Sequence, residues 1–521
     1  MVTFHEIDSD EEKSSLTLES DLRQVESIQS NRDASKQERK RALQLLARII
    51  TGQSAQELNQ VKVLNQLVKF NCRMCHDDAE AIRQGATDNL AALIDKLNGA
   101  PIIFAGLLPT LEARLGTEQM IEGCEELRVK QLELIKHICT GYRSLLGGYL
   151  NELTMIMRRT LEDPFHAIRL ISSSILLTLI EHYAINIHQY AEFFVMPLVN
   201  SLNHQQSRVR AATTNTMLKL LKISAPELLR KNLSYLVQRC FDDSPHVRRA
   251  LFENVLDYML TYRDRYSFFN LFIPILFGFF NDPDDNLAAD AQTGWERCGA
   301  LFERENEEDL KEELDYPRKA ADHYPLGVSR PRLGCRELVG RNLLGMLGAL
   351  GRDCGDNLNV DNRKMASGVL ARVVQHSERV IHQHVPKVAE IVTKGAHDAD
   401  QSIVANHRQI AKWLCILADG ELVLKLTLPG LNGLSLGTLL IVDEFTAIHS
   451  DATMLGEVLD ALDAATGHFC RDDKVLRILR QTVVNLSTKL SNTELDQRKL
   501  LNVDFFCQVG LKTIIFVLTR V

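Results

Sequence analysis

The segment DPFHAIR, from Asp163 to Arg169, decides the fold because its pattern recurs along the chain. The same order, an Asp, four further residues, an aliphatic residue and an Arg, runs from Asp77 to Arg83 and from Asp242 to Arg248. The pattern is incomplete at four further places. It keeps the Asp and the aliphatic residue, without the Arg, at Asp282 with Leu287 and at Asp398 with Ile403. It keeps only the aliphatic and basic pair at Val209 with Arg210 and at Val129 with Lys130. The chain is therefore predicted to consist of repeated units.

The period of the repeat is close to forty residues. The aliphatic positions 82, 129, 168, 209, 247 and 287 lie 38 to 47 residues apart, and the register resumes near Met365 and at Ile403. Each period holds two apolar helical patterns, such as the one that continues after Ile168 and the one that begins at Phe193. This pattern resembles the HEAT repeat, which predicts an all-α solenoid of antiparallel helix pairs, an armadillo-like right-handed superhelix.

The charged residues of the repeat predict a structural role. An Asp before the second helix of a unit can accept a free backbone N–H and complement the positive helix end. The Arg one turn further can reach the equivalent Asp of the adjacent unit. We expect these residues to form a charge ladder that stabilises the stack, and replacement of one Arg to lower thermal stability more than it alters a partner contact. The ladder comprises Asp77, Arg83, Asp163, Arg169, Arg210, Asp242, Arg248, Asp282 and Asp398.

The repeat divides the chain into five predicted segments. Residues 1–35 are polar and predicted to be a disordered tail, and the helix Lys36–Ile50 would cap an array over residues 36–304. An insertion occupies 305–333, repeats continue over 334–418, and 419–521 forms degenerate helical repeats. The last residues, QVGLKTIIFVLTRV, form an apolar helical pattern without a polar cap, which predicts a shortened product or a covered last helix.

The charge and the apolar stretches of the chain limit the partners and the cellular location that we expect. The chain has 521 residues, a net charge of −8 and a pI near 6.1, which disfavours nucleic acid and anionic membrane as main partners. It has no secretory signal, and the longest apolar stretch, Ser267–Phe280, is too short to span a membrane. We therefore expect a cytoplasmic protein.

The sequence offers little chemistry for catalysis or ligand binding. Cys72, Cys75 and His76 spell CRMCH, the spacing of haem attachment, but no export signal or second ligand pair supports a haem or zinc site. His376, His382 and His384 lack further ligands nearby, and no nucleophile elbow or metalloprotease motif occurs. We expect no catalytic residue, no cofactor and no metal, and the eleven cysteines are predicted to be free thiols.

Between Leu301 and Arg336 the repeat fails. Residues 303–315 are mostly acidic, and five Pro and Gly residues then exclude regular helix, which predicts a helix extension followed by a loop. A solvated acidic helix with a tolerated insertion and a partner-docking element both fit this composition. If the insertion is a partner-docking element, five of its residues would contact the partner, and changing them would leave most of the fold intact. These are Tyr316, His323, Tyr324, Arg330 and Arg336.

The insertion also carries a specific resemblance. Its motifs run from Trp295 through ENEEDL at Glu305, HYP at His323 and RP at Arg330 to LGCRELVGRNL at Leu333. Together they resemble the corresponding segment of the HEAT-repeat axonemal dynein assembly factors. The apolar runs KLTL and GTLLIV, at residues 425 and 437, fall where that family has comparable runs, and the similarity covers most of the chain.

The resemblance implies a cytoplasmic, non-enzymatic factor for preassembly of outer and inner dynein arms of motile cilia. Its implied partners are axonemal dynein chains, intermediate or heavy, together with chaperones or other assembly factors. The alternative is a regulatory or transport scaffold of the phosphatase-scaffold or karyopherin type. Family members also continue beyond this length with more repeats.

Overall fold

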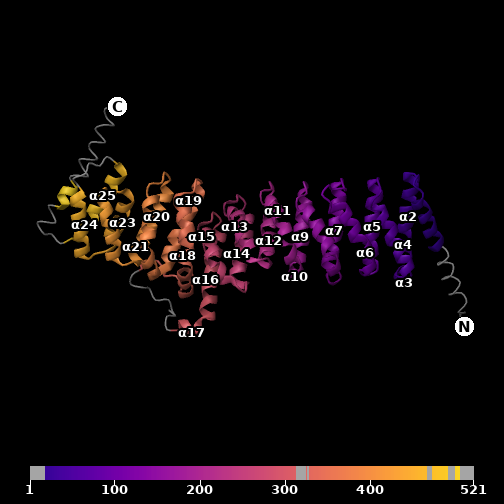
Figure 1. The fold of residues 1–521 in the computed structure, drawn as a ribbon, viewed down its shortest axis with the longest axis horizontal. Coiled ribbons are helices and arrows are strands. Elements are labelled where there is room, and N and C mark those ends of the chain that lie inside the picture. Colours follow the sequence, from indigo (N-terminus) through magenta and orange to yellow (C-terminus); the bar gives the residue numbers. More distant parts are fainter. Residues whose placement is uncertain (1–17, 312–323, 326–327, 466–471, 491–498, 505–521) are drawn as a thin grey trace, which may run out of the picture. The chain divides into compact units, whose positions relative to one another are not determined.

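The computed structural model describes residues 18–311, 324–325, 328–465, 472–490 and 499–504, and these residues form helices without a strand (Figure 1). A helix over residues 18–30 comes first. The α-helices that follow are α2 (Lys36–Gly52), α3 (Ala55–Leu58), α4 (Val61–Met74), α5 (Glu80–Lys96), α6 (Pro101–Leu115), α7 (Glu125–Gly141), α8 (Leu150–Thr160), α9 (His166–His182), α10 (Ala184–Ile187), α11 (Ala191–Leu202), α12 (Ser207–Ile223), α13 (Pro226–Val237), α14 (Pro245–Thr261), α15 (Phe269–Gly278), α16 (Asp285–Glu305), α17 (Glu307–Leu310), α18 (Leu333–Gly355), α19 (Val360–Ser377), α20 (Val385–Gly395), α21 (Gln401–Leu417), α22 (Gly420–Leu431), α23 (Leu436–Ile448), α24 (Ala452–Ala465) and α25 (Asp473–Lys489).

The chain divides into two compact units, Met1–Asn254 and Val255–Val521. In the first unit, the second helices of successive pairs contact one another in the order α2, α5, α7, α9, α12. The first helices form a parallel row, α4, α6, α8, α11, α13. Each pair therefore buries its apolar stripes both within the pair and against the neighbouring pairs, as stacked helical repeats do.

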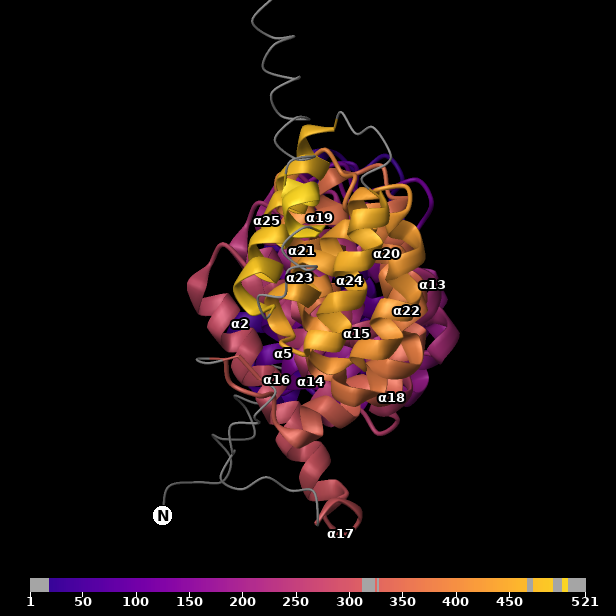
Figure 2. The ribbon, with the colours of Figure 1, turned by 90° about the vertical axis from the view of Figure 1, so that its left-hand side faces the viewer.

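The second unit has the same two-row arrangement. In Figure 2 the row α19, α21, α23, α25 lies on one side and the row α20, α22, α24 on the other. Helix pairing therefore continues beyond residue 418, through the segment in which the Asp–aliphatic–Arg motif is absent. The final apolar residues 505–521, predicted to need a cover, lie outside the described residues.

Local sequence explains where many helices begin. Ser35 and Glu38 form a reciprocal capping box at α2, with the Ser35 backbone N–H donating to Glu38 at 2.7 Å. At the starts of α16 and α21, the side chains of Asp284 and Asp400 each accept two backbone N–H groups. Most of the repeated aliphatic positions are fully buried, Ile168 among them.

The predicted register is wrong at two positions. Val129 and Met365 are only partly buried, whereas Leu127 is 2% exposed and Arg128 follows it directly. In α19 the position equivalent to the repeated Arg is Arg363, two residues before Met365. Both errors follow from choosing the nearest aliphatic residue in a helix where several compete at a spacing of three or four.

The prediction of a disordered tail over residues 1–35 is wrong for its second half. Residues 18–30 are helical, and Leu18, Leu22 and Val25 are buried at a helical spacing. The Gln29 side chain also donates to the Phe70 carbonyl at 2.9 Å. This helix precedes α2, so Lys36–Ile50 does not end the described array as a cap. Residues 1–17 lie outside the described residues.

Helices α16 and α18 approach each other at glycines. A Cβ on Gly334 would lie 2.1 Å from the Gly299 carbonyl oxygen, and one on Gly299 would lie 2.5 Å from the Cys335 sulfur. Since no side chain fits in either place, these two glycines allow the helix on either side of the insertion to pack at backbone distance. The insertion is thus closed at its base by direct helix contact.

No single helix in the described part of the chain is long and apolar enough to cross a membrane. One bent pair, His166–His182 with Ala184–Leu202, meets the length and composition test together, with a bend of 112°.

Candidate functional site: the charge ladder and the insertion

The repeated Asp residues occupy one position in the fold, the turn before the second helix of a pair. Asp163 accepts the backbone N–H of Phe165 at 2.8 Å, and Asp242 accepts that of Ser244 at 3.0 Å. Asp77, Asp282 and Asp398 each accept the N–H two residues later in the same way. The carboxylate thus closes the turn and lies near the positive end of the helix.

The repeated Arg residues connect neighbouring pairs. The two bonds from Arg210 to the Asp242 carboxylate, from Nε and Nη2, are both 2.7 Å long. Arg363 binds Asp398 in the same bidentate form at 2.8 and 3.3 Å, and Arg39 lies 2.7 Å from Asp77. Bidentate pairing of this kind is strong and fixes orientation.

Each such Arg also binds its own turn. Arg210 donates to the carbonyls of His204 and Gln205, both at 2.9 Å, and Arg248 donates to those of Asp242 and Asp243. The guanidinium therefore donates hydrogen bonds to carbonyls of the turn that precedes its own helix. The guanidinium of Arg210 also binds the carboxylate of the next helix pair. The Arg210 and Arg239 side chains and the Ser244 amide lower the pKa of Asp242, although burial alone would raise it.

The ladder departs from the predicted pattern at α7. Arg83 binds Glu122 at 2.8 and 2.7 Å, and Arg114 binds the same carboxylate at 2.6 Å. Burial would raise the pKa of Glu122, but the two arginines outweigh it and lower that pKa. Arg128, which the sequence pattern passed over, binds Asp163 at 3.0 Å. Lys130, the basic residue that the sequence pattern paired with Val129, makes a solvent-accessible pair with Asp88 instead.

Within the described part of the chain, Arg169 faces a hydroxyl rather than a carboxylate. Its Nη1 donates to the Ser201 hydroxyl at 2.9 Å and its Nε to the Asp163 carbonyl at 2.6 Å. Burial consequently lowers the pKa of Arg169, since its attraction to Asp163 and Glu162 does not compensate. The ladder position between α9 and α11 is thus polar rather than ionic.

A further charged cluster joins Arg408 of α21 to residues beyond residue 418. Arg408 lies 2.7 Å from Asp443 and 2.9 Å from Glu444, and Thr482 and Asn485 also donate to Asp443. Burial raises the pKa of Asp443 despite Arg408. Its sequence context, IVDEF, lacks the repeated spacing and so gave no signal.

The insertion residues predicted to contact a partner are turned inward where the structure describes them. Tyr324 is 9% exposed, donates from its hydroxyl to the Gln375 carbonyl at 3.0 Å and packs on Trp413, with ring centroids 5.4 Å apart. Arg336 is 8% exposed and donates to the Pro331 carbonyl at 2.6 Å. Side chains placed in this way cannot present an accessible surface, so the partner-contact interpretation of these residues is wrong.

Arg330 is also committed to the fold. It binds both oxygens of Glu378, at 2.9 and 3.0 Å. Glu378 is buried and has φ 48° and ψ −136°, a conformation that favours glycine. The ion pair thus holds a strained turn between α19 and α20, and it lowers the pKa of Glu378 against the effect of burial. Tyr316 and His323, the other two candidates, lie outside the described residues.

The two sides of the insertion are joined directly. Arg332 binds Glu303 at 2.9 and 2.6 Å, and the Gly334 amide donates to the same carboxylate at 2.8 Å. Glu305, at the end of α16, accepts a hydrogen bond from Tyr266. Of the acidic extension predicted from the sequence, Glu303 and Glu305 therefore belong to α16 and have partners within the fold, and the acidic residues 307–309 lie in the short helix α17.

The cysteines and histidines considered as ligands belong to two separate places in the chain, the end of α4 and the end of α19 with the turn after it. Cys75 is fully buried, and burial raises the pKa of its thiol to about 12, which suits an inert core residue. His376 is buried with Nδ1 2.8 Å from the Arg372 carbonyl. Among the residues that the structure describes, no three His, Cys, Asp or Glu side chains group as metal ligands would.

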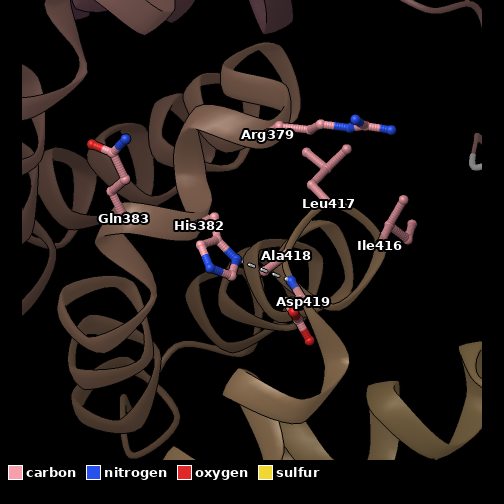
Figure 3. A pocket seen from close by; sticks show the side chains of 7 residues that line it. All are labelled: Arg379, His382, Gln383, Ile416, Leu417, Ala418 and Asp419. Carbon is pink, nitrogen blue, oxygen red and sulfur yellow. Dashed lines mark hydrogen bonds between the residues drawn. The ribbon is translucent and has the colours of Figure 1, made fainter.

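Figure 3 shows the environment of His382, which borders a cavity of about 510 Å³. The Asp419 backbone N–H, at the start of α22, donates to His382 Nδ1 at 3.4 Å. Arg379, Gln383, Ile416, Leu417 and Ala418 line the rest of this cavity. The hydrogen bond between His382 and Asp419 joins the turn after α19 to the start of α22.

The two rows of antiparallel helices and the inter-pair charge ladder define an α-helical repeat protein of the HEAT type. Comparison with known proteins makes this more specific. Residues 30–313 match the model described as "Dynein axonemal assembly factor 5-like, TPR repeats", and residues 322–499 match "Dynein axonemal assembly factor 5, HEAT-repeat domain". The chain belongs to the dynein axonemal assembly factor 5 family.

Individual relatives carry the same name. The Xenopus laevis dynein axonemal assembly factor 5 is 33% identical over 404 residues, which are 77% of this chain and 48% of the relative. The human protein is 32% identical over 70% of this chain and 43% of its own length, and that of Drosophila melanogaster is 25% identical. The chain thus spans about half the length of these relatives.

Solved structures share only the general helical architecture. Yeast importin-beta (Kap95p) aligns over 97% of this chain and 62% of its own, with 12% identity and a TM-score of 0.37. A computationally designed armadillo repeat protein covers 46% of this chain at a TM-score of 0.34. At these scores the likenesses do not bear on function.

Proposed function

We propose that this chain is a non-enzymatic cytoplasmic scaffold for the assembly of axonemal dynein arms, acting before outer and inner arms enter motile cilia. The observation that carries the proposal is the family match over residues 30–313 and 322–499. The relatives' shared name describes assembly of axonemal dynein, and the stacked helical repeat of this chain provides the physical means.

The arrangement of charge supports a binding role rather than catalysis. The buried carboxylates of the ladder, such as Glu122 and Asp242, are occupied by arginines of neighbouring repeats. Stacked repeats of this kind present extended surfaces that can hold large clients. Axonemal dynein intermediate or heavy chains, with chaperones or other assembly factors, are the proposed partners. Nucleic acid and membrane are not expected, in keeping with the net charge of −8.

The test is genetic and biochemical. Ciliated cells that lack the protein are expected to build cilia without dynein arms, and re-expression of this chain is expected to restore the arms, as seen by electron microscopy. Normal arms after a verified null would refute the proposal.

Affinity capture of the tagged chain from cells that are building motile cilia separates the alternatives. Recovery of axonemal dynein chains and chaperones, retained at raised salt, would support the assembly role. Recovery of phosphatase subunits or nuclear transport cargo in their place would assign the chain to another class of repeat scaffold.

A further inference from the structure

Four exposed apolar side chains gather on three neighbouring helices of the first unit. Met155 lies on α8, Phe193 and Met196 on α11, and Tyr235 on α13, with 38, 51, 56 and 40% of their surface exposed. These helices follow one another in the row of first helices. Single exposed apolar residues are common, but a group of large ones on adjacent elements marks an interaction surface. We call these four residues the apolar face.

Contacts between these helices bring the residues to one side of the unit. The Arg158 guanidinium lies over the Phe193 ring, 5.6 Å from its centroid, which brings the outer sides of α8 and α11 together. Met155 lies one turn before Arg158, and Met196 lies one turn after Phe193. Arg239, which follows α13, donates to the Leu202 carbonyl at the end of α11. The turns of α13 therefore run beside those of α11, with Tyr235 on the exposed side.

Charges around the apolar face are distributed unevenly. Glu152, Glu192 and Glu227 occupy the first turns of α8, α11 and α13, where they complement the positive helix ends. Arg158 and Arg159 lie in the last turn of α8, and neither has a carboxylate partner among the residues that the structure describes. The Arg159 Nε is buried without a hydrogen-bond acceptor. Arg158, which is exposed, thus borders the apolar face and is available for an anion, and the partly exposed Arg159 lies next to it.

We propose that the apolar face docks an amphipathic helix of a partner protein, with apolar residues that meet Phe193 and Met196 and acidic residues that meet Arg158 and Arg159. Aromatic side chains, Met and Arg are the residue types enriched where protein partners bind. Met side chains adapt to differently shaped anchors. The first-turn glutamates disfavour a broad anionic surface such as a bilayer, whereas a single helix can lie across the last turns and avoid them. The proposal holds whether or not the partner is a dynein chain.

The experiment uses the full chain and a defined probe. A fluorescein-labelled synthetic helix of about 18 residues, long enough for five turns, carries Leu on one face and Glu on the other. A matched peptide has Lys in place of every Glu. Fluorescence anisotropy at low and high salt measures binding of each peptide to the wild-type chain and its variants.

The acidic peptide is expected to bind saturably, more weakly at high salt, and better than its Lys counterpart. Phe193→Ser and Arg158→Glu are each expected to weaken binding about tenfold or more. Ile185→Ser, on the short helix α10, removes a more exposed apolar side chain outside the face and is expected to leave binding unchanged. If Phe193→Ser shifts the melting temperature, its loss of binding could come from loss of the fold, and the peptide affinity of Arg158→Glu then tests the proposal.

Four results would overturn the proposal. These are no saturable binding of the acidic peptide, equal binding of the Lys peptide, acidic-peptide binding unaffected by Phe193→Ser, and loss of acidic-peptide binding in Ile185→Ser. Vesicles of phosphatidylserine and phosphatidylcholine provide a further arm. Binding of vesicles but not of peptide, sensitive to Phe193→Ser, would assign the face to membranes. Self-association by sedimentation that Phe193→Ser abolishes would assign it to a second copy of the chain.

Discussion

Replacement of Arg210 by Met tests the charge ladder most directly. Met keeps much of the apolar stem but removes the two 2.7 Å bonds to Asp242, whose side chain is 3% exposed. The carboxylate then retains the Ser244 amide at 3.0 Å and Arg239 at 3.5 Å. Breaking a buried ion pair costs about 3–5 kcal/mol, and the remaining partners reduce our expectation to about 2–4 kcal/mol.

Lys130→Met is the matched control. Lys130 also pairs with an acidic residue of the neighbouring helix, Asp88, at 2.6 Å, but the two side chains are 34% and 53% exposed. An ion pair this exposed to solvent contributes little to the free energy of unfolding, about 0–1 kcal/mol. The two variants therefore remove the same kind of charge from the same row of helices at different depths of burial.

Hydrogen exchange read by mass spectrometry is the appropriate assay, because a long repeat array does not unfold in one step. A loss of about 2–4 kcal/mol corresponds to about 30- to 1000-fold faster exchange of the amides in α12 and α13. Arg210→Met together with Asp242→Asn is expected to recover part of the protection, because no buried charge remains unpaired. Exchange of Arg210→Met at the rate of Lys130→Met would refute the ladder argument.

Three further outcomes are expected. Arg169→Met should cost only about 1 kcal/mol by the same exchange measurement, because it leaves the neutral Ser201 hydroxyl without its donor rather than a carboxylate. Arg330→Met should speed exchange at the end of α19 by about tenfold or more, because the strained, buried Glu378 loses its partner; faster dissociation of a client with unchanged exchange would contradict this. The folded pKa of Glu122 is lowered, so its stabilisation is present above the unfolded value of about 4.3 and is lost as pH falls through the folded pKa. Glu122→Gln should therefore lower the melting temperature at neutral pH and reduce its fall in acid, as calorimetry across pH would show.

The sequence predicted the helix pairs and the partner of Arg210 because these depend on local, repeated spacing. At α7 the acceptor is Glu122 rather than Asp, in a turn of different length, so a search for Asp could not find it. The helix over residues 18–30 was missed because its three buried apolar residues stand among many polar ones, and composition outweighed their period.

The interior position of the insertion residues could not be predicted from their neighbours in sequence. Tyr324 and Arg330 find their partners at Gln375 and Glu378, about fifty residues later, through the stacking of successive pairs. Aromatic and Arg residues suit both an exposed binding surface and a buried contact, so residue type alone cannot distinguish the two. The apolar face was missed for a related reason. Phe193 and Met196 lie within an apolar helical run, in which the pattern predicts that every large side chain is buried.

The contact at Gly299 and Gly334, supported by Arg332 and Glu303, holds α16 against α18 through residues that belong to the two helices and their immediate neighbours. The entropic cost of joining two fixed points of a chain grows slowly with the length of the connection, by about 0.6 kcal/mol for each doubling. The packing of α16 on α18 is therefore expected to tolerate a change in the number of residues that join them far better than a side chain at either glycine.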